Sequence, residues 1–159
     1  MLSKIKLFRN GSKLKFTKKD NTGKPDSSTT NMYIFKDDNM VYTIITNSAG
    51  KFGTKHAVDL SYVGMQTGVY ILDLGNDGTI FNSTSRASSG SVLGMDCVKY
   101  TIVSSADASS DYYIYQDNLM LKRSVGSVTE GNTIEALSFD NTTTVPESMF
   151  ELPADVTYY

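Results

Sequence analysis

Residues 4–17 read KIKLFRNGSKLKFT, two runs of alternating apolar and polar residues on either side of Asn10-Gly11. Such alternation is typical of a strand with one buried face, and Asn-Gly between two alternating runs is a strong signal for a β-hairpin. A two-residue turn at Asn10-Gly11 predicts that Leu7 lies opposite Leu14, with Phe16 on the same face. The opposite face of this hairpin then carries the lysines.

The remaining sequence predicts further strands joined by short turns, with little helix. Successive hairpins without intervening helices predict an antiparallel meander. Residues 47–54 are expected to form a turn, because they include Gly50 and Gly53. Only residues 55–66 and 79–90 allow a short helix. The turns that separate the later apolar runs are expected at 37–39, 117–118 and 130–132.

Length and composition fit one domain spanning residues 1–159. Of its residues, 40% are hydrophobic and 20% are charged, which is enough apolar material for a core. No apolar run reaches the roughly 18 residues of a membrane-spanning helix. The start of the chain shows no signal peptide, which leaves a cytosolic protein or a leader absent from this sequence. We therefore predict an all-β-dominated fold with minor α.

Candidate catalytic and metal-binding residues are few. The single cysteine, Cys97, excludes an intrachain disulfide, and together with the single histidine, His56, it leaves too few ligands for a structural zinc site. His56 has no nucleophile motif to support a catalytic triad. Cys97 starts an apolar strand and is expected to be buried and inert. We expect no enzyme activity, no catalytic residue, no metal and no cofactor.

Charge is distributed unevenly along the chain. The first 24 residues contain eight Lys or Arg and one Asp, whereas residues 124–159 contain six acids and no Lys or Arg. Such polarity directs one edge of a protein toward an anionic surface. Nucleic acid is not an expected partner, because the net charge is −2 and Phe8 is the one aromatic residue on the basic face. A peripheral membrane contact is expected through Lys4, Lys6, Lys13 and Lys15.

Three motifs between residues 92 and 154 carry a family resemblance. Residues 92–100 contain Gly94, Cys97 and Tyr100, each three residues from the next, and residues 113–122 form an aromatic strand, a turn and a Leu-x-Leu-Lys strand. Residues 145–154 contain the motif Val-Pro-x-Ser-x-Phe-x-Leu-Pro. Together these motifs resemble the LolA/LolB-like lipoprotein-carrier superfamily of bacterial envelope proteins.

This resemblance implies a curved antiparallel sheet that forms an incomplete barrel, with a few short helices over its concave face. It implies a non-enzymatic protein of the bacterial cell envelope or periplasm. The ligand would be an acyl chain, a lipoprotein or another hydrophobic molecule, held in the hollow of the half-barrel. The alternative is an interaction or adaptor domain whose concave sheet, or open sheet edge, receives a protein partner, which includes a second copy of the chain.

Strand parity selects the candidate ligand-binding residues. Tyr42 and Ile44 are expected to point inward because Thr43, between them, is compatible with water. In the hairpin around 117–118, Ile114 is expected opposite Leu121, and this face is placed inward. The residues expected to line the hollow are Leu7, Leu14, Phe16, Tyr42, Ile44, Tyr70, Leu72, Ile114 and Leu121.

Overall fold

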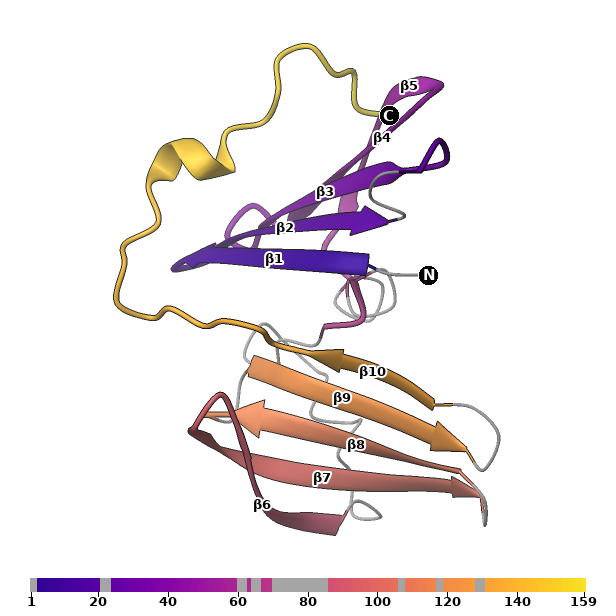
Figure 1. The fold of residues 1–159 in the computed structure, drawn as a ribbon. Helices are drawn as coiled ribbons and strands as arrows, with labels where there is room; N and C mark the ends of the chain where they lie inside the picture. Colours follow the sequence, from indigo (N-terminus) through magenta and orange to yellow (C-terminus); the bar gives the residue numbers. More distant parts are fainter. Residues whose placement is uncertain are drawn as a thin grey trace. The chain divides into compact units, whose positions relative to one another are not determined.

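The computed structural model of the chain is mostly β-strand (Figure 1). One short 3₁₀ helix, η3 (Glu147–Phe150), lies near the end of the chain. The structure describes residues 3–20, 24–59, 63, 67–69, 86–105, 108–116, 119–127 and 131–159. The predicted all-β class is thereby confirmed.

The first five strands form one antiparallel sheet in the order of the chain. Each strand pairs with the next through a short connection, so the sheet is a simple meander. This confirms the predicted antiparallel topology for the first part of the chain. The strands are β1 (Ser3–Asn10), β2 (Lys13–Asp20), β3 (Ser28–Phe35), β4 (Met40–Asn47) and β5 (Gly50–Ala57).

The other five described strands form a second antiparallel sheet, again a meander. The chain divides into two compact units, residues 1–59 with 141–159 and residues 60–140. The expectation of one continuous sheet was wrong, because the described strands form two sheets of five. The second sheet contains β6 (Arg86–Val92), β7 (Met95–Ser105), β8 (Ala108–Tyr115), β9 (Leu119–Ser127) and β10 (Gly131–Glu135).

The first hairpin has a different register from the predicted one. Asn10 pairs with Lys13, so the turn residues are Gly11 and Ser12 rather than Asn10 and Gly11. Gly11 has a φ of +57°, while Ser12 is not among the residues with positive φ. A glycine at the first turn position is the pattern of a type II′ turn, which needs only that residue at positive φ. Leu7 therefore lies opposite Phe16, not opposite Leu14.

The slip moves every pair by two positions, so the faces of the hairpin stay as predicted. Leu14 and Phe16 on β2 are fully buried, at 0% exposure. Their partners on β3, Ile34 and Met32, are also buried and continue the same row across the sheet. We call this side of the first sheet the core face, because it carries the largest fully buried side chains of the described chain.

Two segments that the sequence did not predict as strands are strands in the structure: most of the expected turn at 47–54, and residues 86–90 of the range in which a short helix was allowed. Residues 50–57 form β5, which continues the sheet beyond β4, so only residues 48–49 remain as the turn. Residues 86–92 form β6, which pairs with β7 over its whole length. Both expectations relied on the low β propensity of glycine and serine, which pairing with a neighbouring strand overrides. Residues 79–85, the rest of the range that allows a short helix, lie outside the described residues.

Each side of the second sheet has its own apolar cluster. One cluster joins Tyr112, Ile114 and Met120, and the other joins Val92, Cys97 and Leu121. The β8–β9 register shifts by one residue between Tyr113 and Ile114, and this bulge places Met120, and not Leu121, on the face of Ile114. The predicted pairing of Ile114 with Leu121 was therefore wrong, and Ile114 lies opposite Met120.

Thr43 is buried on the core face, which contradicts its expected place in water. It is 4% exposed and pairs with Met32, and its hydroxyl Oγ1 has no hydrogen-bond partner. A buried hydroxyl without a partner costs roughly 1–3 kcal/mol of stability. We expect Thr43→Val, which keeps the shape and removes the hydroxyl, to raise the free energy of unfolding by ~1 kcal/mol in urea titrations. A less stable valine variant would show that the hydroxyl is satisfied in solution.

Cys97 is 6% exposed, and burial raises the pKa of its thiol. Little thiolate is then present at neutral pH, and the thiolate is the reactive form. We expect the native protein to react with a thiol reagent far more slowly than the urea-unfolded chain does. Labelling of both forms at the same rate would contradict the burial of Cys97.

Candidate interaction surface

The residues predicted to bind a ligand do not share one face of the first sheet. Leu14 and Phe16 belong to the core face, with Leu7 beside them on β1. Tyr42 pairs with Tyr33, which pairs with Lys15, so Tyr42 lies on the opposite side with the lysines. Ile44 follows at i+2 of the same strand and takes this side too. We call this side the lysine face.

The remaining predicted residues lie in the other unit or outside the described chain. Ile114 and Leu121 are both buried, at 1% and 4% exposure, but they belong to different clusters of the second sheet. Tyr70 and Leu72 lie outside the described residues. Within the first sheet, Leu14 and Phe16 therefore lie on the face opposite to Tyr42 and Ile44, so these four residues do not line one hollow.

The end of the chain, residues 141–159, returns to the first unit and crosses part of the lysine face (Figure 1). We call these residues the strap. At the first hairpin, the Asn10 side chain donates to the Val145 carbonyl at 3.0 Å, and Lys13 Nζ forms a 2.5 Å ion pair with Glu147. This bond raises the pKa of Lys13. Phe150, in η3, is 3% exposed.

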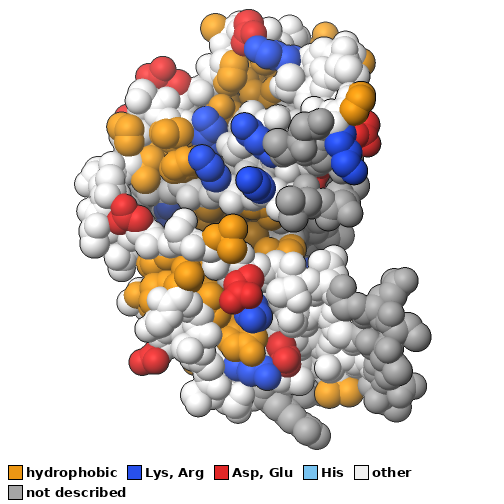
Figure 2. Space-filling view, viewed as in Figure 1, with side chains coloured by type: hydrophobic (Ala, Val, Ile, Leu, Met, Phe, Trp, Pro, Cys, Tyr) orange, Lys and Arg blue, Asp and Glu red, His pale blue; other side chains and the backbone are white. Residues whose placement is uncertain are grey.

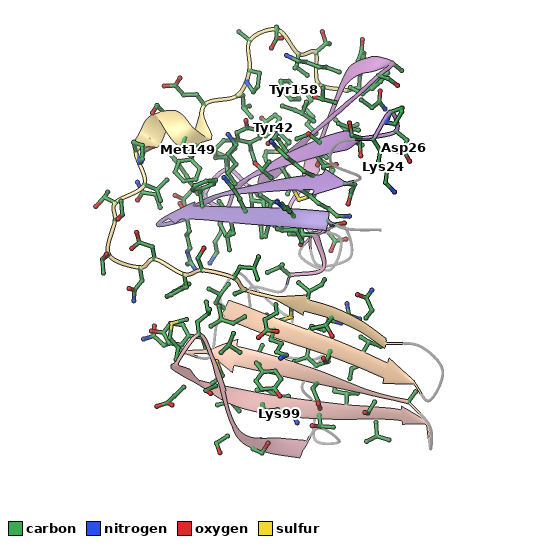
Figure 3. All side chains as sticks on the ribbon, in the orientation of Figure 1. Lys24, Asp26, Tyr42, Lys99, Met149 and Tyr158 are labelled. Carbon is green, nitrogen blue, oxygen red and sulfur yellow. The ribbon has the colours of Figure 1, made fainter. Side chains whose placement is uncertain are left out.

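Farther along, the strap ends on β5 and its neighbour β4. Tyr158 and Tyr42 pack edge to face at 5.3 Å between ring centroids, and Figure 3 shows the two labelled side chains together. Burial raises the pKa of the Tyr158 phenol. Lys51 pairs with Asp155 at 2.5 Å, which lowers the pKa of that carboxyl. Sequence reasoning missed this contact, and the signal for it was the aromatic end of the chain.

The strap also closes the β5 edge of the sheet. The Lys55 amide donates to the Tyr159 carbonyl at 2.9 Å, and the Tyr159 amide donates to the Gly53 carbonyl at 3.4 Å. Tyr158 forms a parallel bridge with Gly53. These bonds satisfy backbone groups that an edge strand otherwise leaves to water or to another chain.

Beyond the strap, the lysine face carries a cluster of cations on β1 and β2, where Figure 2 shows blue side chains gathered. We call Lys4, Lys6, Lys15 and Lys19 the basic cluster. Lys4 lies directly opposite Lys19, and Lys6 lies opposite Thr17, diagonal to both Lys15 and Lys19. Directly opposed residues are ~5 Å apart and diagonal ones ~7–8 Å. These are distances between Cβ atoms, and like charges placed directly opposite each other, such as Lys4 and Lys19, destabilise a pair of strands.

The basic cluster has no carboxylate partner among the residues that the structure describes. In contrast, Lys13, Lys18, Lys51, Lys99 and Lys122 each form an ion pair. Asp20, the acid of the first hairpin, lies on the core face, where it contacts Lys18 and the Ser3 hydroxyl. Lys4, Lys6 and Lys19 are exposed.

One lysine of the basic cluster, Lys15, packs over an aromatic ring. Lys15 Nζ lies 4.8 Å from the centroid of the Tyr33 ring, and Tyr33 itself is 3% exposed. This cation–π contact fixes the lysine over the sheet. Phe8 lies opposite Lys15 on β1 and is half-buried. The cluster is therefore held on two paired strands rather than on a loop.

A second group of lysines, in the other unit, is already neutralised. Lys99 and Lys122 flank the Tyr113 ring at 5.7 and 5.6 Å. Lys99 pairs with Asp111 at 3.1 Å, which raises its pKa, and Lys122 pairs with Glu135 at 3.1 Å. This group is a cross-strand network on a sheet surface, and it leaves no net charge for a partner.

The described residues contain neither a candidate metal site nor a candidate membrane-spanning helix. No group of three or more His, Cys, Asp and Glu side chains there is placed to hold a metal ion. No helix in the described part of the chain is long and apolar enough to cross a membrane. Comparisons with protein-family models, curated proteins and solved structures find no match for this chain. The lipoprotein-carrier resemblance, and the envelope location that it implies, stay predictions.

The strap depends on the absence of a side chain at Gly53. A Cβ there would lie 2.5 Å from Val156 Cγ1 and 2.6 Å from the Thr157 carbonyl oxygen. We expect Gly53→Ala to displace the end of the strap, to lower the free energy of unfolding by about 1–3 kcal/mol, and to speed proteolysis within residues 151–159.

The matched control for this change is Gly126→Ala in β9, where an added Cβ meets no atom within 4 Å. Its free energy of unfolding should stay within about 0.5 kcal/mol of the wild type. Equal stability and equal proteolysis of the two variants would show that the strap is not seated on β5.

Proposed function

We propose that this protein is a non-enzymatic interaction domain that binds an acidic protein partner through its basic cluster. The observation that carries the proposal is the concentration of Lys4, Lys6, Lys15 and Lys19 on two paired strands without a carboxylate among the described residues. Opposed like charges destabilise a sheet. A bound anionic partner relieves this repulsion, so the fold itself favours binding.

The strap supports the same proposal because it limits the open part of the lysine face. Its carboxylates neutralise Lys13 and Lys51, and neither of these two ion pairs involves a lysine of the basic cluster. Lys13, which we expected to contact a membrane with the other lysines, is therefore already engaged by Glu147. The open cations gather on β1 and the neighbouring part of β2.

An acyl ligand is less well supported. Leu14 and Phe16 have 0% exposure, and Ile44, Ile114 and Leu121 are each at most 4% exposed. These side chains already have packing partners, and an acyl chain would have to replace those contacts. The predicted ligand residues are better explained as core, which favours the interaction-domain alternative.

Binding of fluorescent polyglutamate, measured by fluorescence anisotropy, tests the proposal. We expect saturable binding that weakens steeply with added salt, because exposed charges are screened. The double variant Lys4→Glu/Lys6→Glu should bind at least about tenfold more weakly, which corresponds to ~1.4 kcal/mol. Its free energy of unfolding should not fall, since the change replaces opposed like charges by an opposite pair.

The matched control is Lys36→Glu, which reverses an exposed lysine in the turn between β3 and β4. It changes the net charge in the same direction at a site away from the basic cluster. We expect it to keep most of the affinity. Equal losses in Lys36→Glu and in a single Lys6→Glu variant would mean that net charge, and not the cluster, governs binding.

A further inference from the structure

The basic cluster lies beside a sheet edge. Of the described strands, β1 pairs with β2 alone. In an antiparallel ladder, alternate residues direct both backbone groups to one neighbour. Asn10 and Lys13 close the two-residue turn as a hydrogen-bonded pair, so residues 8, 6 and 4 bond to β2. Ile5 and Leu7 then direct their N–H and C=O groups away from the sheet.

The same alternation applies at β5, the opposite edge of this sheet. Counted across the sheet from the first turn, it directs the backbone groups of Gly53 and Lys55 outward on β5, and these are the groups that bond to Tyr159. The chain therefore covers one edge of this sheet with its own end. The β1 edge has no such cover among the described residues, and its eight residues pair with β2 without a bulge.

An edge of this length is a template for another strand unless something opposes pairing. Lysines on an edge strand oppose pairing with a like-charged strand. An antiparallel second copy of β1 that pairs about Ile5 would place Lys4 against Lys6 of the other chain. The edge thus excludes its own copy by charge and favours an acidic strand.

We propose that the acidic partner binds as an extended segment that adds a sixth strand to the sheet along β1, an inference that rests on the proposed function. Every second residue of an added strand shares the face of Lys4 and Lys6, and the residues between them share the face of Ile5 and Leu7. Ile5 and Leu7 are half-buried. The segment that fits therefore alternates Glu or Asp with Val, Ile or Leu. Main-chain bonds supply affinity, and alternate side chains supply specificity.

The test uses a fluorescent synthetic peptide of alternating Glu and Val, and the same peptide N-methylated on its central amides. N-methylation removes the backbone donors and leaves the charges unchanged. We expect the N-methylated peptide to bind at least about tenfold more weakly, or ~1.4 kcal/mol. In hydrogen exchange of the full chain, the Ile5 and Leu7 amides should become protected by the unmodified peptide alone.

The two proposals fail in different ways. If both peptides bind equally, Lys4→Glu/Lys6→Glu still weakens binding and Ile5 and Leu7 gain no protection, the basic cluster stands and the added strand is wrong. If no acidic probe binds even at low salt, the proposed function is wrong. Dimers in sedimentation runs that protect Ile5 and Leu7 would make a second copy the occupant. Binding to phosphatidylserine vesicles, but not to the peptide, would assign the surface to a membrane.

Discussion

The period of two in an antiparallel ladder is the constraint on which the rest of this structure depends. Paired residues share a face, so each hairpin register decides which side chains meet. In the first sheet, the ladder pairs Leu14 with Ile34 and Phe16 with Met32, so all four residues lie on the core face. The same ladder gathers Lys4, Lys6, Lys13, Lys15 and Lys19 on the other face. Burial of one face and charge on the other are thus one consequence of register.

The strap determines how the lysine face is used. It supplies carboxylates to Lys13 and Lys51, an aromatic ring to Tyr42 and backbone groups to β5. Its ion pairs are between exposed side chains and contribute little stability by themselves. The buried Phe150 and the close fit over Gly53 give the strap its definite position. The strap leaves the basic cluster and the β1 edge open. These two features present the charge and the backbone groups that a partner could bind.

The two lysine groups of the molecule show why charge alone does not identify an interaction surface. Lys99 and Lys122 lie beside Tyr113 much as Lys15 lies over Tyr33. Asp111 and Glu135 neutralise the first two. Lys15 has no carboxylate partner among the described residues, and Lys6 lies diagonal to it on β1. A partner would gain from neutralising the basic cluster, because no carboxylate of the described residues neutralises it.

The sequence by itself determined the all-β class, the antiparallel hairpins and the separation of Leu14 and Phe16 from the lysines, because alternation of residue type is local and directly readable. Only the tertiary structure decided the type II′ turn at Gly11, the strand at 50–57 and the bulge after Tyr113. Each of these depends on hydrogen bonds with a neighbouring strand, which outweigh weak local preferences. The tertiary structure also decided which lysines form ion pairs. Glu147 and Asp155 reach Lys13 and Lys51 from more than a hundred residues away, and no local pattern encodes a contact of that separation.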